Sequence, residues 1–390
     1  MGQEIILHQL LDYSVLRVIW WLLLCVLLIG FAIMDGFDLG VASLLPFLGK
    51  NDVERRIIIN TVGPVWEGNQ VWLITAGGAI FAAWPALYAV SFSGFYLAMF
   101  AVLFALILRP VGFKYRSKVH SATWRQVWDW CLFIGGAVPA LIFGVALGNV
   151  LQGVPFHFNS EMRIFYEGSF FALLNPFAIM AGLLSVAMLI MHGSAWLSIK
   201  TQGAVQARAN KVGLVAGLAT AVLFILAGLW LYMGVKGYDI TSVIDANGPS
   251  NPANKTAIAG TEQNFWFTNY GKAPFLWVVP ALAVIGALLS AVMIKSGKSL
   301  LAWIFSSVSM TGVILSLAIS MFPFLLPSSL NPSHGLTIWD ASSSHMILFI
   351  MLVVALIFVP IVLAYTGYVY YVLRGKVTRE SVDDNKTFAY

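Results

Sequence analysis

Long apolar stretches recur from one end of this chain to the other, and they limit what it can fold into. A helix needs about 20 mostly apolar residues, rising about 1.5 Å each, to cross a hydrocarbon core of about 30 Å. Of the 390 residues, 59% are hydrophobic and 10% are charged, whereas a soluble domain carries about 25% charged residues. The chain therefore cannot cover itself with a solvated surface, and we predict an all-α integral membrane protein.

About nine membrane spans are expected, within a single domain that covers residues 1–390. Their approximate bounds are 14–34, 62–84, 86–108, 127–149, 170–191, 212–234, 274–294, 300–325 and 344–372. The first apolar run has no basic segment before it and no small-residue cleavage site after it, so we interpret it as a retained span. A polar stretch at 236–272 is the one long loop expected.

The lysines and arginines test this arrangement independently. With the N-terminus outside, 17 of the 22 fall in segments that would face the cytoplasm. Basic residues concentrate on the cytoplasmic side of membrane proteins, and a wrong helix count would scramble their alternation. The bias predicts an outer N-terminus and an inner C-terminus. It also accounts for the formal charge of +5 without a nucleic-acid partner.

Two aspartates, Asp35 and Asp38, stand at the end of the first predicted span. Their spacing puts both on one face if the helix continues. A carboxylate within a span is costly and usually faces a bundle interior or a water path. The alternative interpretation is that they only finish one helix and cap the next, with Gly36 and Gly40 forming the turn.

Glu67 and Arg109 are the other ionisable residues near the cytoplasmic ends of spans. Glu67 lies a few residues inside the second span, beside Trp66, and we interpret it as functional. Arg109 ends the third span before Pro110, where an interface anchor is a more typical role than pairing with a carboxylate. Carboxylates can pass protons along water, and a neighbouring cation tunes their pKa. Together these residues predict a cytoplasmic proton intake path.

The histidines argue against a haem held by this chain. A membrane haem with two protein ligands needs His or Met side chains that face each other inside the bundle. Four of the six histidines fall in loops or near the N-terminus, while His192 and His345 fall at helix ends on opposite faces. The thirteen methionines are typical of core packing.

Other short patterns receive structural interpretations. Cys25 and Cys131 lie inside predicted helices, without a metal-binding spacing, so we expect buried thiols and no metal site. Gly77-Gly78 and Gly135-Gly136 predict close helix packing. Trp128-Asp129-Trp130 is typical of an interfacial aromatic belt with an aspartate at a helix start.

Several longer motifs are distinctive as sequences. They are Asp35-Gly36-Phe37-Asp38-Leu39-Gly40, Trp66-Glu67-Gly68-Asn69-Gln70-Val71-Trp72, Arg109-Pro110-Val111-Gly112-Phe113, Gly148-Asn149-Val150-Leu151-Gln152-Gly153, Met321-Phe322-Pro323-Phe324 and Trp339-Asp340-Ala341-Ser342. With these motifs the chain resembles subunit II of the cytochrome bd quinol oxidases. The likeness runs from about residue 12 to the C-terminus.

The resemblance implies a fold and a partner. Members of the family are built from two four-helix bundles plus one peripheral helix and lie in the bacterial cytoplasmic (inner) membrane. They pair with a subunit I that binds the b-type and d-type haems and oxidises quinol, and the complex reduces O2 to water. Subunit II ligates no haem. The family leaves room for a structural quinone in this subunit and for a small accessory single-helix subunit.

The resemblance also implies roles for particular residues. The acidic residue of the Trp-Glu-Gly-Asn motif, here Glu67, is expected on a proton path towards the haems. Some members carry Asp there, and the extra methylene of Glu67 shifts the carboxyl by about a bond length. Asp38, with Asp35, is expected as the next relay or as a partner of Arg109. Trp66, Asn69 and Gln70 are expected to support this site.

Two other hypotheses fit the composition. A proton-coupled carrier would also place carboxylates in the membrane, although no repeat is evident and nine spans do not divide evenly. A structural scaffold would shield the haem subunit from lipid without conducting protons. A carrier would purify alone and colourless, and a scaffold would keep its turnover after Glu67→Gln.

Overall fold

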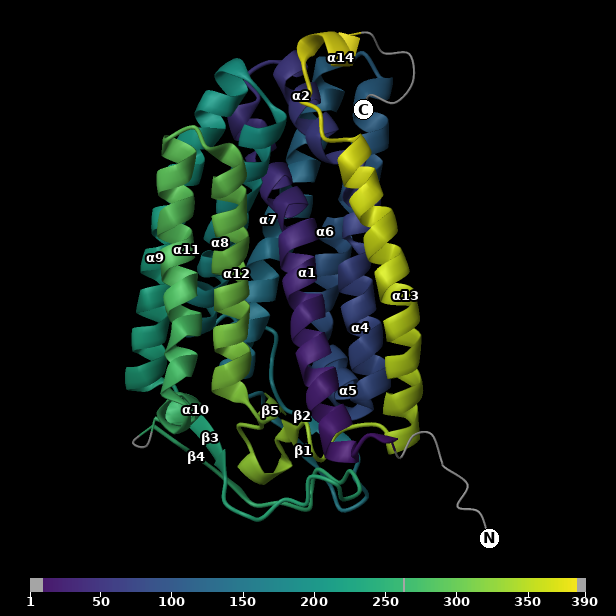
Figure 1. The fold of residues 1–390 in the computed structure, drawn as a ribbon, viewed down its shortest axis with the longest axis vertical. Helices are drawn as coiled ribbons and strands as arrows, with labels where there is room; N and C mark the ends of the chain where they lie inside the picture. The colour runs from purple at the N-terminus through teal and green to yellow at the C-terminus, as the bar shows by residue number, and fades with distance from the viewer. Residues whose placement is uncertain (1–9, 262–263, 384–390) are drawn as a thin grey trace.

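The computed structural model describes residues 10–261 and 264–383, and most of it is helical (Figure 1). The helices are α1 (Tyr13–Leu48), α2 (Asp52–Val62), α3 (Trp66–Asn69), α4 (Val71–Ala83), α5 (Pro85–Gly94), α6 (Tyr96–Tyr115), α7 (Ala122–Gln152), α8 (Pro176–Lys200), α9 (Gly203–Gly234), α10 (Thr268–Lys272), α11 (Val278–Lys295), α12 (Ser299–Met321), α13 (His345–Val372) and α14 (Arg379–Asp383). The strands are β1 (Phe156–Phe158), β2 (Ile164–Tyr166), β3 (Gly237–Ile240), β4 (Ala257–Gly260), β5 (Phe324–Leu326) and β6 (Leu336–Thr337). They pair as three two-stranded antiparallel sheets, β1 with β2, β3 with β4 and β5 with β6.

Eight helices in the described part of the chain are long and apolar enough to cross a membrane. They are α1, α6, α7, α8, α9, α11, α12 and α13, and each overlaps a predicted span. The all-α class is therefore as the composition predicts.

The predicted second span, 62–84, does not form one helix. α2 ends at Val62, Gly63 and Pro64 follow, and the single-turn helix α3 precedes the 13-residue α4. Proline lacks the backbone N–H that would continue a helix, and glycine tolerates the break. The third predicted span, 86–108, is divided between α5 and α6. Figure 1 places α2 at one end of the bundle and α5 near the other, so the chain still traverses the bundle between them.

The long helices pack in two groups, with α13 at the edge (Figure 1). α1, α4, α6 and α7 make up one group, and α8, α9, α11 and α12 make up the other. α1 and α7 both pack against α8 and join the groups. α13 contacts α1, and only 11% of its most apolar stretch is buried.

The first helix runs well beyond the predicted end at residue 34. α1 continues to Leu48, through Asp35, Gly36, Asp38 and Gly40. A side chain at either glycine would overlap Leu189 of α8. The glycines therefore let two helices approach closely instead of forming a turn. The interpretation of the aspartates as helix caps is wrong.

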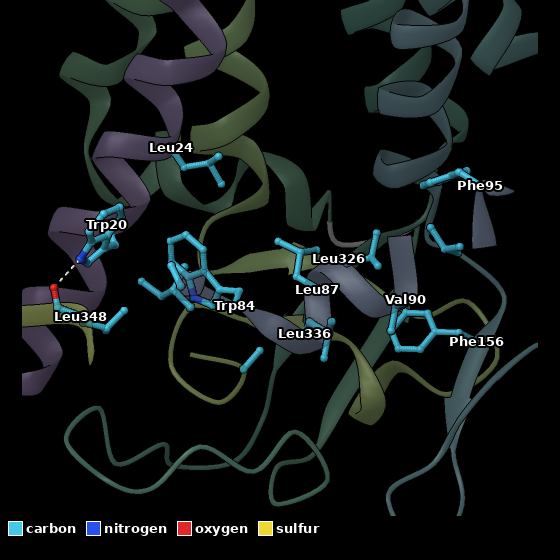
Figure 2. Packing of buried hydrophobic residues seen from close by; sticks show 14 of the residues in the cluster. Trp20, Leu24, Trp84, Leu87, Val90, Phe95, Phe156, Leu326, Leu336 and Leu348 are labelled. Carbon is cyan, nitrogen blue, oxygen red and sulfur yellow. Dashed lines mark hydrogen bonds between the residues drawn. The ribbon is translucent and has the colours of Figure 1, made fainter. Parts of the chain in front are cut away.

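The two ends of the bundle differ in construction. One end, called the α14 end, carries α2 and α14, and the other, called the strand end, carries the six strands (Figure 1). The predicted loop 236–272 lies at the strand end and contains β3, β4 and α10. An apolar cluster there joins α1, α5, α13 and the strands β1, β5 and β6, as Figure 2 shows. Within it, Trp20 Nε1 donates a 2.9 Å hydrogen bond to the carbonyl oxygen of Leu348, which ties α13 to α1 (Figure 2).

Candidate functional site

Asp35 and Arg109 form the centre of a buried charge cluster between α1 and α6. Arg109 Nη1 and Nη2 donate to Asp35 Oδ2 and Oδ1 at 3.1 and 2.7 Å. Both side chains are only 1% exposed. A bidentate pair of this kind is the strongest geometry for a guanidinium and a carboxylate. Buried ions need such a closely paired and hydrogen-bonded partner to offset the cost of leaving water. The interpretation of Arg109 as an interface anchor is therefore wrong.

Asp38 lies about one turn further along α1 and supplies a second buried carboxylate. Its Oδ2 accepts a 2.8 Å hydrogen bond from Asn69 Nδ2, and Arg109 Nη2 lies 3.9 Å away. Its Oδ1 is buried without a hydrogen-bond partner. Tyr370 of α13 donates to Asn69 Oδ1 at 2.6 Å. Side chains from α1, α3, α6 and α13 therefore converge on Asp38.

The triad of Asp35, Asp38 and Arg109 holds two carboxyl groups and one guanidinium. With both carboxyl groups ionised, it carries one net negative charge while all three side chains are at most 1% exposed. An uncompensated buried charge costs several kcal/mol even after the surroundings relax. Binding one proton removes that net charge, so the triad has the chemistry of a site that exchanges a single proton.

Asn69 was expected as a supporting residue, and the structure places it against Asp38. Tyr370, 301 residues away in the chain, was not expected. The sequence offers no signal for it, because a tyrosine near the end of a span is typical of the membrane interface. Only the packing of α13 brings it to the site.

Glu67 is not part of this cluster. Its side chain is 64% exposed, and its Oε1 lies 3.8 Å from Nζ of Lys114, which is 57% exposed. The neighbouring Trp66 is buried instead, with its ring centroid 5.4 Å from that of Phe113. Gln70 is half-buried at the start of α4. The structure therefore separates the expected Glu67 from the expected aspartates.

Glu67 and Lys114 stand beside an apolar face that α4 and α6 present. Its most exposed large side chains include Ile74 at 69%, Phe104 at 66%, Ile107 at 62% and Leu103 at 60%. A Cβ added to Gly77 or Gly78 would meet nothing within 4 Å, whereas one added to Gly135 or Gly136 would press on α6 or α1. Of the two glycine pairs expected to allow close packing, only the second does so among the residues that the structure describes.

His192 lies inside a helix and not at its end as the predicted spans imply. α8 continues to Lys200, nine residues past the predicted boundary at 191, and His192 is fully buried. Its Nδ1 lies 2.7 Å from Ser306 Oγ, and its Nε2 lies 2.9 Å from the carbonyl oxygen of Ile33. With both ring nitrogens engaged, His192 does not fit the role of a haem ligand.

The other described histidines also fit a haem poorly. His157, His334 and His345 lie in or beside the strand-end segments, and His120 is exposed in the connection before α7. His8 lies outside the described residues. Within residues 10–261 and 264–383, no group of three or more His, Cys, Asp or Glu could hold a metal ion.

Asp129 belongs to a second buried charge cluster, at the α14 end. α7 begins at Ala122, so Asp129 lies about two turns inside the helix. It pairs with Arg116 at 2.5 Å and with Arg55 at 2.7 Å, and Arg116 also contacts Asp52 at 3.0 Å. The interpretation of Asp129 as a helix-start residue is wrong. Its ion pairs connect α2 and the end of α6 to α7.

The strand end buries charge in a different way. Lys255 Nζ lies 2.8 Å from Asp340 Oδ2, and the side chains are 2% and 9% exposed. Burial lowers the pKa of Lys255 and raises the pKa of Asp340, while the charge of each partner opposes the shift. The fully buried Arg17 donates to the carbonyl oxygens of Ala246 and Gly248 at 2.6 and 3.0 Å. These contacts fasten the long loop to α1 and to the segment before α13.

The chain is similar in sequence to a known family and to individual proteins in it. The chain matches the model of a family described as cytochrome bd terminal oxidase subunit II over residues 16–373. It is 54% identical to a probable cytochrome oxidase subunit 2 of Haemophilus influenzae over 98% of this chain and 100% of that protein. It is 49% identical to the cytochrome bd-I ubiquinol oxidase subunit 2 of Escherichia coli K12, with the same coverage.

The fold also has a solved counterpart. The chain superposes on a chain of the bd oxidase from Geobacillus thermodenitrificans with a TM-score of 0.67, covering 92% of this chain and 97% of that one. The two sequences are 17% identical in this superposition, so the likeness concerns the fold.

Proposed function

Because the chain belongs to the cytochrome bd terminal oxidase subunit II family, we propose that it is the second subunit of a bd-type quinol oxidase. With a haem-bearing subunit I, the complex oxidises quinol, reduces O2 to water and contributes to the proton-motive force. The observation that carries this proposal is the 54% and 49% identity to family members along nearly the whole chain. The complex is the enzyme, and this subunit is not active alone.

The proposed location is the bacterial cytoplasmic membrane, with the N-terminus outside and the C-terminus inside. We count the broken path through α3 and α4 as the ninth crossing, beside the eight long helices of the described chain. The α14 end then faces the cytoplasm. The placement of basic residues supports this orientation, because Arg55 lies in α2, Arg116 pairs with Asp52 of α2, and Lys200 lines a cavity beside α2.

The haem-bearing partner is proposed to pack on the apolar face of α4 and α6. Lipid would suit the apolar side chains of this face but not the adjacent Glu67 and Lys114. The open space over Gly77 and Gly78 admits a close helix, as small residues do in membrane packing. The b-type and d-type haems are ligated by the partner, since the described histidines of this chain do not fit that role.

The buried triad gives this subunit a proposed part in proton intake. Asp38 takes up a proton from the cytoplasmic side, Arg109 pairs with Asp35, and Asn69 orients the Asp38 carboxyl group. Glu67 acts separately, on the surface that the partner covers, where it passes protons towards the haem subunit. These proposed proton transfers use side chains of this chain and no haem.

The first test is an absorption spectrum of the complex purified through a tag on this chain. We expect bands of reduced b-type and d-type haem and a second large subunit that co-purifies. A colourless chain that runs alone would contradict the oxidase assignment and favour the carrier hypothesis.

The second test separates a proton path from a scaffold. Glu67→Gln keeps the size of the side chain and removes its charge, so we expect quinol oxidase turnover to fall by about tenfold or more. Glu161→Gln is the matched control, because Glu161 is also 64% exposed and paired with an arginine, but in the strand-end segments. Equal turnover of both variants would support the scaffold.

A further inference from the structure

A cavity of about 100 Å³ lies at the α14 end, between α2, α8, α13 and the segment that follows α13. Its walls include Thr61, Val65, Trp196, Lys200, Tyr370 and Val377. Roughly 10–15 Å³ is enough space for one water molecule, so several fit. A second cavity, of about 10 Å³, is lined entirely by apolar residues and offers water no partner.

The walls of the larger cavity mix apolar and polar groups, and hydrogen bonds tie the polar ones together. Lys200 Nζ donates to the carbonyl oxygens of Leu373 and Gly375, and the backbone N–H of Val377 donates back to the carbonyl oxygen of Lys200 at 2.8 Å. Trp196 Nε1 donates to the carbonyl oxygen of Thr61 at 3.1 Å. These bonds connect the elements around the cavity, and Thr61, Lys200 and Tyr370 are among the polar side chains in its lining that could contact water.

The cavity borders the hydrogen-bonded chain that leads to Asp38. Tyr370 lines it and donates to Asn69 Oδ1 at 2.6 Å, and Asn69 Nδ2 donates to Asp38 Oδ2 at 2.8 Å. The groups that face Asp38 are Asp35 from its own helix, Arg109 from α6, Asn69 from α3 and Tyr370 from α13. Among these, only Tyr370 also lines the cavity.

An amide side chain does not relay protons as water or a carboxyl group does, because its N–H protons are too weakly acidic to be released. Asn69 held between Tyr370 and Asp38 therefore closes the route, and Asn69 turned aside opens it. We propose that the cavity is the water-filled vestibule through which Asp38 exchanges protons with the cytoplasm, and that Tyr370 is the positioning residue that holds Asn69 closed. This inference rests on the proposed role of Asp38.

The chemical step is a single proton transfer. A hydronium ion in the vestibule breaks one O–H bond, a new O–H bond forms on Asp38 Oδ1, and a water molecule remains. The transfer removes the net negative charge of the triad. Oδ1 is the available acceptor, since Oδ2 accepts from Asn69 and Oδ1 has no partner.

The test follows hydrogen–deuterium exchange of the Asp38 carboxyl group by infrared spectroscopy on the purified complex. The band of Asp38 is the carboxyl band that disappears in Asp38→Asn. In Tyr370→Phe, which loses the hydroxyl but keeps the ring, we expect exchange to be about fivefold faster, the factor that one net hydrogen bond is worth. Tyr368→Phe is the control, because Tyr368 is on the same helix and 67% exposed.

A second variant changes the exchange rate in the opposite direction. Val377→Phe fills part of the vestibule and keeps the backbone bond to Lys200, so we expect slower exchange. Unchanged exchange in both variants, or slower exchange in both, would overturn the inference and leave the proposed role of Asp38 intact. If Asp38→Asn removes no carboxyl band, Asp38 binds no proton and the proposed function itself fails at this residue.

Discussion

The α14 end and the strand end both bury charged side chains, yet they do so with different balance. At the strand end, Lys255 and Asp340 meet one to one at 2.8 Å. Towards the α14 end, two carboxyl groups share one guanidinium, and Asp38 Oδ1 has no partner. With both groups ionised, the balanced pair carries no net charge. The unbalanced triad has one net negative charge when both carboxyl groups are ionised, and it becomes neutral only by binding a proton.

The surroundings of the two sites reinforce this difference. The Lys255–Asp340 pair fixes a loop, and nearby Arg17 donates to backbone carbonyl groups and serine hydroxyl groups. The triad lies at a junction of four helices, and Tyr370 connects it to a cavity with room for water. We therefore associate proton exchange with the triad, where two carboxyl groups share one guanidinium and a cavity with room for water is close.

The largest expected effect comes from removing the cation of each site. Arg109→Leu leaves two buried carboxyl groups without a cation, so we expect a loss of about 3–5 kcal/mol in stability and little assembled oxidase. Lys255→Met leaves only Asp340 unpaired and should reduce assembly less. Haem absorbance per milligram of membrane protein measures the amount of assembled oxidase in both variants.

Double variants sharpen this first prediction. Lys255→Met with Asp340→Leu removes the whole strand-end pair and should restore assembly, because apolar replacements of a buried pair are often neutral. Arg109→Leu with Asp35→Leu still leaves Asp38 buried, and should restore less. Equal recovery of the two double variants would contradict the distinction between a balanced pair and an unbalanced triad.

For Asp38→Asn we expect a smaller effect on assembly than for Arg109→Leu, but a large effect on turnover. The substitution keeps the shape of the side chain and leaves Asp35 paired with Arg109, so assembly should persist. Turnover per haem should fall by about a hundredfold, the usual contribution of a proton-transfer group. Asp340→Asn should instead lower the Tm of the complex and keep turnover per haem. Similar turnover in the two variants would remove the functional difference between the ends.

The smallest expected effect concerns a balanced, partly exposed pair at the α14 end. Arg208 Nη2 lies 2.6 Å from Glu54 Oε2, with side chains 28% and 18% exposed. Burial acts to raise the pKa of Glu54, but the hydrogen bond and charge of Arg208, with backbone N–H groups, hold it below its ordinary value of 4.5. Because the pKa is lowered in the folded state, the stabilisation is present above that ordinary value and is lost as the pH falls through the lowered one.

This pair is tested by the pH dependence of the Tm of the complex. Arg208→Gln should cost about 0.5–1 kcal/mol near neutral pH, and its difference from the unmodified protein should close on acidification below about pH 4.5. Lys211→Gln, an exposed position on the same helix, is the control. A difference that persists in acid would mean that the charge of Glu54 does not stabilise the fold.

The sequence pointed to most of the polar residues of the buried cluster, but it did not predict where the helices end. Asp35, Asp38 and Arg109 were expected because ionisable residues at the ends of apolar spans are conspicuous, and Asn69 was expected from the family resemblance. The roles assigned to Arg109 and Asp129 were wrong, since an ion pair depends on a partner distant in the chain. α1 continues past residue 34 because its polar residues find partners in the bundle, which a hydropathy pattern does not reveal.

The sequence alone determined that this is an all-α membrane protein of the bd oxidase subunit II family, because apolar length and long motifs are local properties of the chain. Tertiary structure decided that the second span is broken, that Glu67 lies at the surface, and that Tyr370 reaches Asn69. These features depend on which helix faces meet. That choice follows from packing and charge pairing between residues as far apart as 301 positions, and no local pattern encodes it.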